Sequence, residues 1–178
     1  MSVITVEQQT FFEETVSKYT GYAYAIAFRI LGNRDDAEDA VQESFFKMYR
    51  HMDRYDSRKE MKNWIAVITV NASRDIYRRQ KQHAHLDLSH AESVAAGIRA
   101  GQSSIDTRLT VEQIMGCLDL KHRIVIVLFY QEQMPTREIS RILKVPQVLV
   151  KVRLHRARKK LMRILERLEK EQSTDCMP

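Results

Sequence analysis

The sequence predicts an all-α protein made of two small helical domains joined by a flexible linker, with a helix-turn-helix in the C-terminal domain. The 178 residues include only 5 Gly and 3 Pro, whereas residues that favour helices are abundant. Apolar residues recur at helical spacing in residues 7–81 and again in residues 107–170. Residues 82–106 show weak periodicity and many small polar side chains, which indicates a linker between domains.

Three helices are expected in the N-terminal domain, over residues 7–31, 34–52 and 59–81. Gly32 follows the first of them and is a typical stop signal. Asp35 and Asp36 open the second, where carboxylates suit the positive end of the helix dipole. The third carries one apolar stripe that we expect to face a shared core, and its members are Met61, Trp64, Ile65, Ile68, Ala72 and Ile76.

Four further helices are expected between residues 107 and 170. Cys117 lies in an apolar helical context and is expected in the core. The last helix should continue from a helix-turn-helix, and the tail 172–178 should be frayed.

The helix-turn-helix is the strongest motif of the chain. Residues 135–143 predict a short helix, Lys144-Val145-Pro146 a turn, and residues 147–161 the first part of a longer helix. From Lys144 to Arg163 there are eight basic residues and no acidic one, which favours DNA as partner over an ordinary basic surface helix. In such a motif the second helix meets base edges and phosphates, so the expected DNA contacts are Lys151, Val152, Arg153, His155, Arg156 and Arg158.

Charge alternates along the chain. The net charge is −4 over residues 1–53, +5 over 54–82, −3 over 83–120 and +8 over 121–178. Two basic zones suggest two separate nucleic-acid contacts, and the acidic zones suggest a surface for a basic partner. The alternative is chance clustering of charge on solvated helix faces.

Several classes of protein are not indicated. No apolar run approaches the about 18 residues that span a bilayer, and no secretion signal is recognisable. Two cysteines make neither a disulfide framework nor a zinc site. The sequence shows no nucleophile–base pair, phosphate-binding glycine loop or metal cluster. We therefore expect a cytoplasmic protein that is not an enzyme and has no cofactor, metal or small-molecule substrate.

A polar strip follows one side of the second predicted helix. Its members recur three and four residues apart and are Asp35, Glu38, Asp39, Gln42 and Glu43. On composition alone it is a solvated acidic face, and paired carboxylates also allow an acid–base or metal site. A docking surface for a basic partner is the sharper interpretation.

Aromatic, amide and basic side chains interleave between residues 55 and 81. Proteins that hold unstacked bases use such mixtures, with rings against base faces, amides on base edges and cations on phosphates. The relevant residues include Tyr55, Asn71, Arg74, Arg78 and Arg79.

Taken in order, these features resemble the extracytoplasmic-function (ECF) sigma factors of bacterial RNA polymerase. The resemblance covers residues 10–82 and 107–165. It depends on Ala37-Glu38-Asp39 with Gln42-Glu43, on Trp64 and Asn71, on Asp75 with Arg78-Arg79, and on the run Arg153-Leu154-His155-Arg156-Ala157-Arg158.

The resemblance implies a specificity subunit of the polymerase. Region two of that family docks on the beta-prime clamp helices, and the matching positions are Asp36, Glu38, Asp39, Gln42 and Glu43. It also melts the minus-ten element and captures a flipped base. The matching positions for minus-ten DNA are Tyr55, Lys59, Met61, Asn71, Arg74, Arg78 and Arg79.

Region four of the family implies recognition of the minus-thirty-five element as duplex by the helix-turn-helix. The remaining partners implied are the beta flap of core polymerase, promoter DNA, and an anti-sigma factor, which is often membrane-bound. Such a factor would hold the protein at the inner membrane face.

The chain departs from the family at the helix-turn-helix. Lys144 stands where glycine is usual, Val148-Leu149 replace Gly-Thr, and Val152 replaces serine. If position 144 needs a positive φ, lysine costs about 1 kcal/mol there. The apolar residues imply either contacts with thymine methyl groups or a surface for a regulator. The main rival function is a free-standing helix-turn-helix regulator that binds duplex DNA without polymerase.

Overall fold

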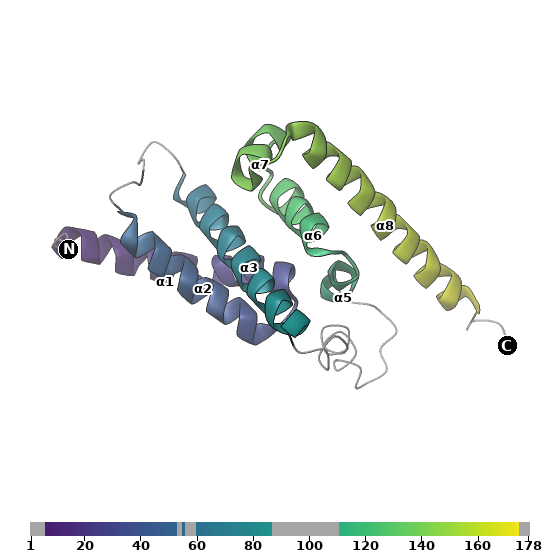
Figure 1. Ribbon diagram of the computed structural model, residues 1–178, viewed down its shortest axis with the longest axis horizontal. Helices are drawn as coiled ribbons and strands as arrows, with labels where there is room; N and C mark the ends of the chain where they lie inside the picture. Colours follow the sequence, from purple (N-terminus) through teal and green to yellow (C-terminus); the bar gives the residue numbers. More distant parts are fainter. Residues whose placement is uncertain (1–5, 53–54, 56–59, 87–110, 175–178) are drawn as a thin grey trace. The chain divides into compact units, whose positions relative to one another are not determined.

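The computed structural model describes residues 6–52, 55, 60–86 and 111–174. Every regular element in these ranges is helical, and the chain divides into two compact units, residues 1–83 and 84–178 (Figure 1). The predicted all-α fold with two helical domains is confirmed. The predicted linker 82–106 lies mostly outside the described residues.

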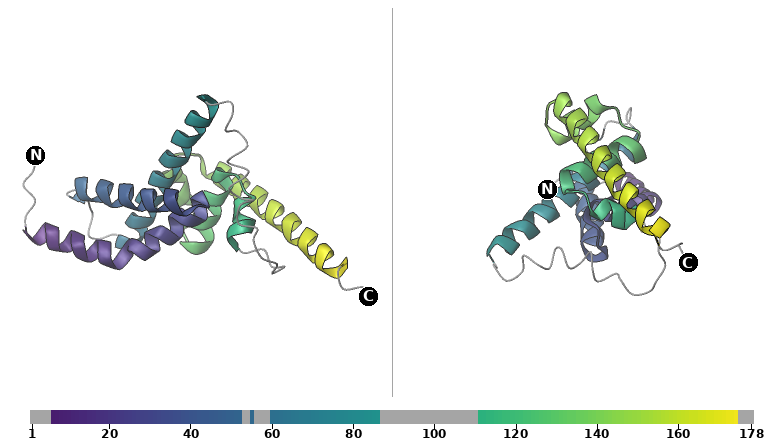
Figure 2. Two further views of the ribbon diagram at one scale, coloured as in Figure 1. Left: turned by 90° about the horizontal axis from the view of Figure 1, so that it is seen from below. Right: turned by 90° about the vertical axis from the view of Figure 1, so that its right-hand side faces the viewer.

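The first unit contains three long helices, α1 (Val6–Leu31), α2 (Arg34–Arg50) and α3 (Met61–Leu86). Gly32 ends α1 with φ 82°, and its N–H donates to the carbonyl of Phe28 at 2.8 Å. Asn33 then caps α2, because its side chain accepts a hydrogen bond from the N–H of Asp36 at 2.9 Å. The two-residue connection forces α1 and α2 to pack against each other, as Figures 1 and 2 show.

The core of the first unit is built from residues that recur at helical spacing. Its largest fully buried apolar side chains are Ile26, Ile30, Met48, Ile65 and Val70. Small polar residues are buried with them: the hydroxyl of Ser44 donates to the carbonyl of Ala40, and that of Ser73 to the carbonyl of Thr69. These bonds satisfy the hydroxyls within their own helices, so the core carries them at low cost.

The second unit contains α5 (Val111–Gly116), α6 (Leu120–Ile126), a π-helical turn η2 (Val127–Gln131), α7 (Thr136–Leu143) and α8 (Gln147–Thr174). The N-terminal half of α8 packs on α6 and α7, and its C-terminal half runs on past them (Figure 1). The largest fully buried side chains of the unit are Leu118, Leu128, Ile139, Val125, Val127 and Val150.

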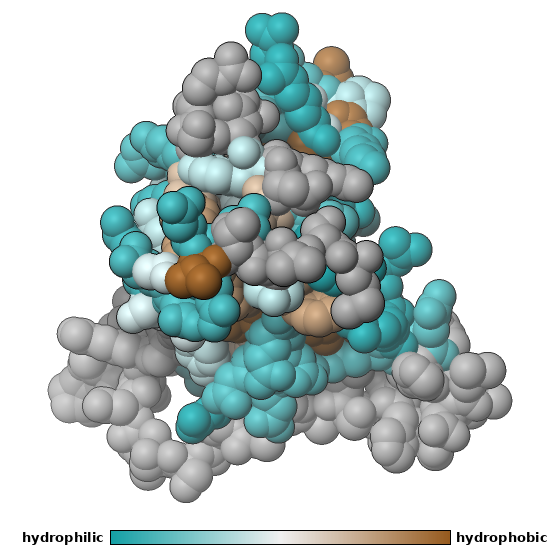
Figure 3. Space-filling view, turned by 90° about the vertical axis from the view of Figure 1, so that its left-hand side faces the viewer, coloured by the Kyte–Doolittle hydropathy of each residue, from teal (hydrophilic) through white to brown (hydrophobic). Residues whose placement is uncertain are grey.

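Polar side chains dominate the exposed faces of these helices. The face drawn in Figure 3 is largely hydrophilic, and its hydrophobic residues occur as separate spots. Amphipathic helices produce this distribution because their apolar stripes turn toward the core. None of the helices described is long and apolar enough to cross a membrane.

Several boundary and burial predictions are wrong. Helix α3 continues to Leu86, beyond the predicted end at 81, because no glycine or proline interrupts it. Helix α8 continues to Thr174, so part of the tail predicted to fray is helical. Trp64 is half-buried, and Cys117 is exposed although its context predicted the core. Cys117 lies just beyond the C-terminus of α5, where the six-residue helix no longer sets which side faces inward.

Candidate functional site

The predicted acidic strip lies along α2, where α3 runs beside it. Glu38, Asp39 and Gln42 are exposed, whereas Asp36 and Glu43 are half-buried. Part of the strip opens into a groove of about 390 Å³ between the two helices. The residues that line the groove are Asp36, Asp39, Gln42, Glu43, Ile76, Arg79 and Gln80.

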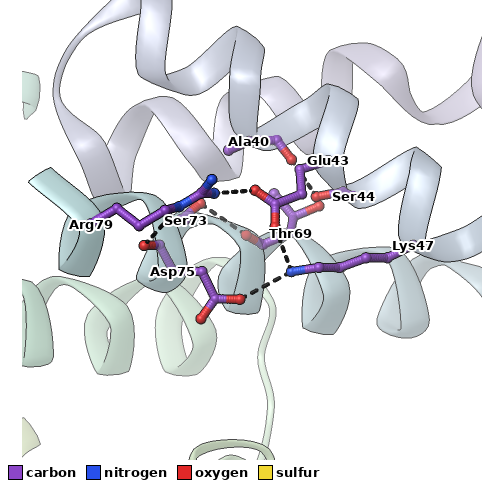
Figure 4. Close-up of polar contacts among 8 residues, drawn as sticks. All are labelled: Ala40, Glu43, Ser44, Lys47, Thr69, Ser73, Asp75 and Arg79. Carbon is purple, nitrogen blue, oxygen red and sulfur yellow. Dashed lines mark hydrogen bonds and ion pairs between the residues drawn. The ribbon is translucent and has the colours of Figure 1, made fainter.

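Glu43 is the centre of an ion-pair network that joins α2 to α3 (Figure 4). Its Oε1 lies 2.9 Å from Lys47 Nζ, and its Oε2 lies 2.5 Å from Arg79 Nη2. Lys47 also reaches Asp75 Oδ2 at 3.0 Å. Burial alone would lower the pKa of Lys47, but its hydrogen bonds to Glu43 and Asp75 outweigh burial and raise the pKa above its usual value. The network therefore keeps its charges and holds the two helices in register.

The N-terminal end of α2 is also braced by side chains. Gln80 Nε2 of α3 donates to Asp36 Oδ1 at 2.5 Å, and Arg34 pairs with Glu38 at 2.8 Å. The cap by Asn33 could have been found in the sequence, because asparagine before Asp35-Asp36 is a typical start signal. The pairing with Gln80 had no such signal, because its partners are 44 residues apart.

Among the described residues, the side chains of Asp39 and Gln42 have no ion-pair or hydrogen-bond partner. Both side chains line the groove. They lie between the two ends of the strip, which are held by contacts with other side chains. Their side chains are thus available to a partner without breaking an internal contact. A basic partner that fits this strip would gain an attraction from the carboxylate of Asp39 and a hydrogen-bonding amide from Gln42.

The predicted minus-ten residues spread along α3. Trp64, Asn71 and Arg78 recur every seven residues, so they share one side of the helix, with Arg74 beside them. Asn71 and Arg74 are half-buried, and Arg78 is exposed. Met61 begins the helix and is half-buried, and Lys59 lies outside the described residues.

Tyr55 precedes α3 and stacks on Trp64, with ring centroids 5.0 Å apart and planes at 29°. Phe11 of α1 also contacts Tyr55, with ring centroids 6.2 Å apart. The aromatic end of the α3 surface is therefore a cluster contributed by three segments. Arg79 does not join this surface, because it is paired with Glu43 on the side of α3 that faces α2.

The helix-turn-helix forms as predicted from α7 and α8. Lys144 has φ 52° and ψ 47°, so the turn needs the left-handed conformation that glycine adopts without strain. The N–H of Val145 closes the turn on the carbonyl of Ser140 at 3.1 Å. Ile139 and Leu143 of α7 are buried, as are Val150 and Leu154 of α8.

The exposed side of α8 carries Lys151, Val152, His155 and Arg156, as the sequence predicts, and Arg153 is half-buried. Arg158 is placed differently from the other cations. Its Nε donates to Tyr130 Oη at 2.6 Å, and its guanidinium lies over the rings of Phe129 and Tyr130, 5.5 and 5.4 Å from their centroids. The sequence carries no signal for this contact, because η2 brings the aromatic pair to α8 from 28 residues away.

No metal centre is indicated in the part of the chain that the structure describes. Those residues contain no group of three or more histidine, cysteine or acidic side chains that could hold a metal ion.

Comparison with known proteins matches both units of the chain to family models. Residues 15–83 match the family model for Sigma-70 region 2, and residues 108–161 match that for Sigma-70 region 4. The ECF RNA polymerase sigma factor SigW of Bacillus subtilis (strain 168) is 32% identical over 171 residues, which cover 90% of this chain and 91% of SigW. The chain belongs to the ECF sigma factors.

Other relatives agree with this family. The RNA polymerase sigma factor CnrH of Cupriavidus metallidurans is 30% identical over 169 residues, 89% of this chain and 88% of CnrH. A solved structure of CnrH in complex with the cytosolic domain of CnrY superposes with a TM-score of 0.57 over 89% of each chain, at 29% identity. The sigma factor RpoE from Bartonella quintana, solved with the anti-sigma factor NepR, shares the fold, with a TM-score of 0.62 over 87% of this chain and 96% of RpoE, at 18% identity.

The two regions of the sigma factor coincide with the two units of the structure. The match to region 2 includes all of α2 and most of α3, and therefore the acidic strip, the groove and the Asn71 surface. The match to region 4 includes the helix-turn-helix and ends at residue 161, within α8.

Proposed function

We propose that the acidic strip of α2 and the basic side of α8 bind different partners of this sigma factor. As a member of its family, the protein binds core RNA polymerase and directs transcription initiation at specific promoters. In our proposal the acidic strip of α2 grips the polymerase, α3 holds melted minus-ten DNA, and α8 reads the minus-thirty-five duplex. The single observation that carries it is the exposed, cation-rich side of α8 in one unit and the exposed Asp39 and Gln42 in the other.

The docking proposal involves the beta-prime clamp helices of core polymerase, by resemblance to the family. Asp39 and Gln42 would make the first contacts, because they have no internal partner to give up. Glu38 and Glu43 would join by exchanging or sharing their cations, Arg34 for the first and Arg79 for the second. Such exchange costs little for the exposed Arg34–Glu38 pair, whose net contribution to stability is about 0–1 kcal/mol.

The minus-ten proposal uses the seven-residue stripe of α3. The Tyr55–Trp64 stack would support the face of an unstacked base, Asn71 would hydrogen-bond a base edge, and Arg74 and Arg78 would hold the strand backbone. Extruding a base costs a few kcal/mol, and stacking on an aromatic ring returns about 1–3 kcal/mol per base. Arg79 would join this group by exchanging its ion pair with Glu43 for a phosphate.

The minus-thirty-five proposal places α8 in the major groove. Lys151, His155 and Arg156 would face the duplex near the N-terminal half of the helix, and the cations beyond Arg158 would contact phosphates. The beta flap would hold this unit on the polymerase. The protein would contribute binding and positioning only, with the polymerase supplying the chemistry.

An anti-sigma factor is the further partner that we propose. The support comes from the solved complexes of RpoE with the anti-sigma factor NepR and of CnrH with the cytosolic domain of CnrY. A membrane-bound factor with a cytosolic domain would keep the protein at the inner face of the membrane until a signal releases it. Outside that complex, the protein would act in the cytoplasm.

A free-standing regulator is not favoured, because the N-terminal unit matches Sigma-70 region 2. Run-off transcription with core polymerase that lacks any other initiation subunit tests the proposal. We expect the protein to start transcripts from a subset of a promoter library, and silence on every template would reject it. Tight, specific binding of duplex DNA in a gel-shift without core polymerase would favour the regulator instead.

Asn71→Ala separates the two DNA roles. We expect it to impair open-complex formation, measured by permanganate reactivity of unpaired thymines, more than binding of the minus-thirty-five duplex. Equal loss of both would count against the α3 surface as the site of base capture.

A further inference from the structure

The first turns of α8 present apolar side chains to solvent. Val148 is 71% exposed, and Leu149 and Val152 are each 37% exposed. Val148 and Val152 are one helical turn apart and therefore lie on the same side of α8. They do not belong to the core. The core contacts of this part of α8 are made by Val150 and Leu154 on the opposite side, which are 0% and 3% exposed.

The polar side chain at the start of α8 is engaged within the protein. Gln147 Nε2 donates to Thr136 Oγ1, the first residue of α7, at 2.8 Å. This bond braces the two helices of the motif and occupies one N–H of the amide. The next three residues are all aliphatic, so the exposed surface of the first turn consists of Gln147 together with Val148 and Leu149.

The setting of this patch selects its partner. It lies at the N-terminal end of the second helix of a helix-turn-helix, which is the part that meets base edges in the major groove. Eight basic residues and no acidic one lie between Lys144 and Arg163, so the surrounding charge complements a DNA backbone rather than a basic or neutral protein. In the major groove, thymine alone of the four bases presents a methyl group.

We infer that Val148, Leu149 and Val152 determine promoter specificity by packing against thymine methyl groups of the minus-thirty-five element. This inference rests on the proposed role of α8 in reading that element. The aliphatic residues would read thymine by shape and apolar contact, while Lys151 and Arg156 on the same helix supply the hydrogen-bonding and phosphate contacts.

Replacing thymine with deoxyuridine tests the inference, because it removes the methyl group and leaves the hydrogen-bonding edge unchanged. The polymerase holoenzyme containing this protein first selects a minus-thirty-five sequence from a randomised promoter library. Binding is then compared between thymine and deoxyuridine at each selected position. We expect deoxyuridine to weaken binding about fourfold per contacted methyl, the equivalent of about 0.8 kcal/mol per buried methyl or methylene group.

Val152→Ala and Val148→Ala are the matched variants. Alanine favours helix more than valine does, so these changes at exposed positions preserve α8. We expect each variant to lose the discrimination against deoxyuridine at one position of the element and to keep it elsewhere. Deoxyuridine placed upstream of the promoter serves as the control and should change nothing.

The outcomes separate this inference from the proposed function. Selection of a minus-thirty-five element whose binding is indifferent to deoxyuridine would overturn the methyl contact while leaving the sigma function in place. Discrimination that persists unchanged in both alanine variants would also overturn it. Failure of the holoenzyme to select or transcribe any sequence would overturn the proposed function, and the inference with it.

Discussion

The charged residues of α2 and those of α8 are organised in opposite ways. On α2, Glu43 pairs with Lys47 and Arg79, and Glu38 pairs with Arg34. On α8, no cation between Lys151 and Arg163 forms an ion pair with any residue that the structure describes. Arg158 is the one that is held, and its partners are aromatic rings and a hydroxyl rather than a carboxylate.

This difference indicates how each surface binds. Two carboxylates of the α2 strip, Glu38 and Glu43, are paired with cations of the protein, so only part of the strip's charge faces a partner. The α8 cations between Lys151 and Arg163 form no ion pair with a described residue, so they attract a polyanion over distance and release its counterions on contact. We therefore expect polymerase docking to depend on a few particular side chains, and promoter binding by α8 to depend strongly on salt.

Asp39→Lys should have the largest effect of the changes considered. It reverses a charge on the docking strip without breaking an ion pair, and it places a cation where a basic partner would bind. We expect affinity for core polymerase to fall by more than about 2 kcal/mol, measured by fluorescence titration with core enzyme.

Glu14→Lys in α1 is the control, because it makes the same charge reversal at an exposed position outside the strip. Unchanged helical circular dichroism should show that both variants are folded. Equal affinity of Asp39→Lys and wild type for core polymerase would remove the strip from the interface.

Arg156→Ala and Arg158→Ala sharpen the comparison within α8. Loss of Arg156 should weaken minus-thirty-five binding by about 1–3 kcal/mol if it reaches a base edge, with the size depending on promoter sequence. Loss of Arg158 should instead lower the free energy of unfolding by about 1 kcal/mol, because a hydrogen bond and cation–π contacts disappear. The measurements are holoenzyme binding over a range of salt and thermal unfolding of the free protein.

Tyr130→Phe completes this pair, since it removes only the hydroxyl that accepts from Arg158. It should reproduce part of the stability loss and leave the salt dependence of DNA binding unchanged. A reduced salt dependence in Arg158→Ala, equal to that in Lys151→Ala, would show that Arg158 contacts phosphate after all.

Lys144→Gly separates charge from backbone conformation in the helix-turn-helix. Glycine adopts the left-handed conformation found at this position without strain. The free energy of unfolding should therefore rise by up to about 1 kcal/mol. DNA affinity should fall slightly in low salt because one cation is lost. A lower melting temperature for Lys144→Gly than for wild type would contradict the strain.

Glu132 extends the comparison to an acidic group of the second unit. Burial raises the pKa of Glu132 from its ordinary value of 4.5 to about 7, the opposite of a carboxylate that gains a cation. The folded state therefore holds this proton more tightly than the unfolded state, so its contribution to stability should decline as pH rises from about 4.5 to about 7. Glu132→Gln should flatten that decline in thermal unfolding curves, and an unchanged pH profile would contradict it.

Local features were predictable from sequence because each depends on neighbouring residues. Gly32 marks the end of α1, and its φ of 82° shows why glycine stands there. The helical periodicity located Ile65, Ala72 and Ile76 in the core. Predictions failed where no local signal exists: the end of α3 lacks a stop residue, and the short α5 leaves Cys117 exposed.

The sequence by itself determined the all-α fold, the helix-turn-helix and the alternation of acidic and basic segments along the chain. Periodicity, turn chemistry and composition act over a few residues, so they are legible without coordinates. Only the tertiary structure decided which charged side chains pair with other residues of the protein. Glu43 contacts Arg79, and Tyr130 contacts Arg158, because packing brings together residues that are 36 and 28 positions apart in the sequence. The side chain of Asp39 and those of Lys151 and Arg156 on α8 have no such partner among the described residues, so they face outward.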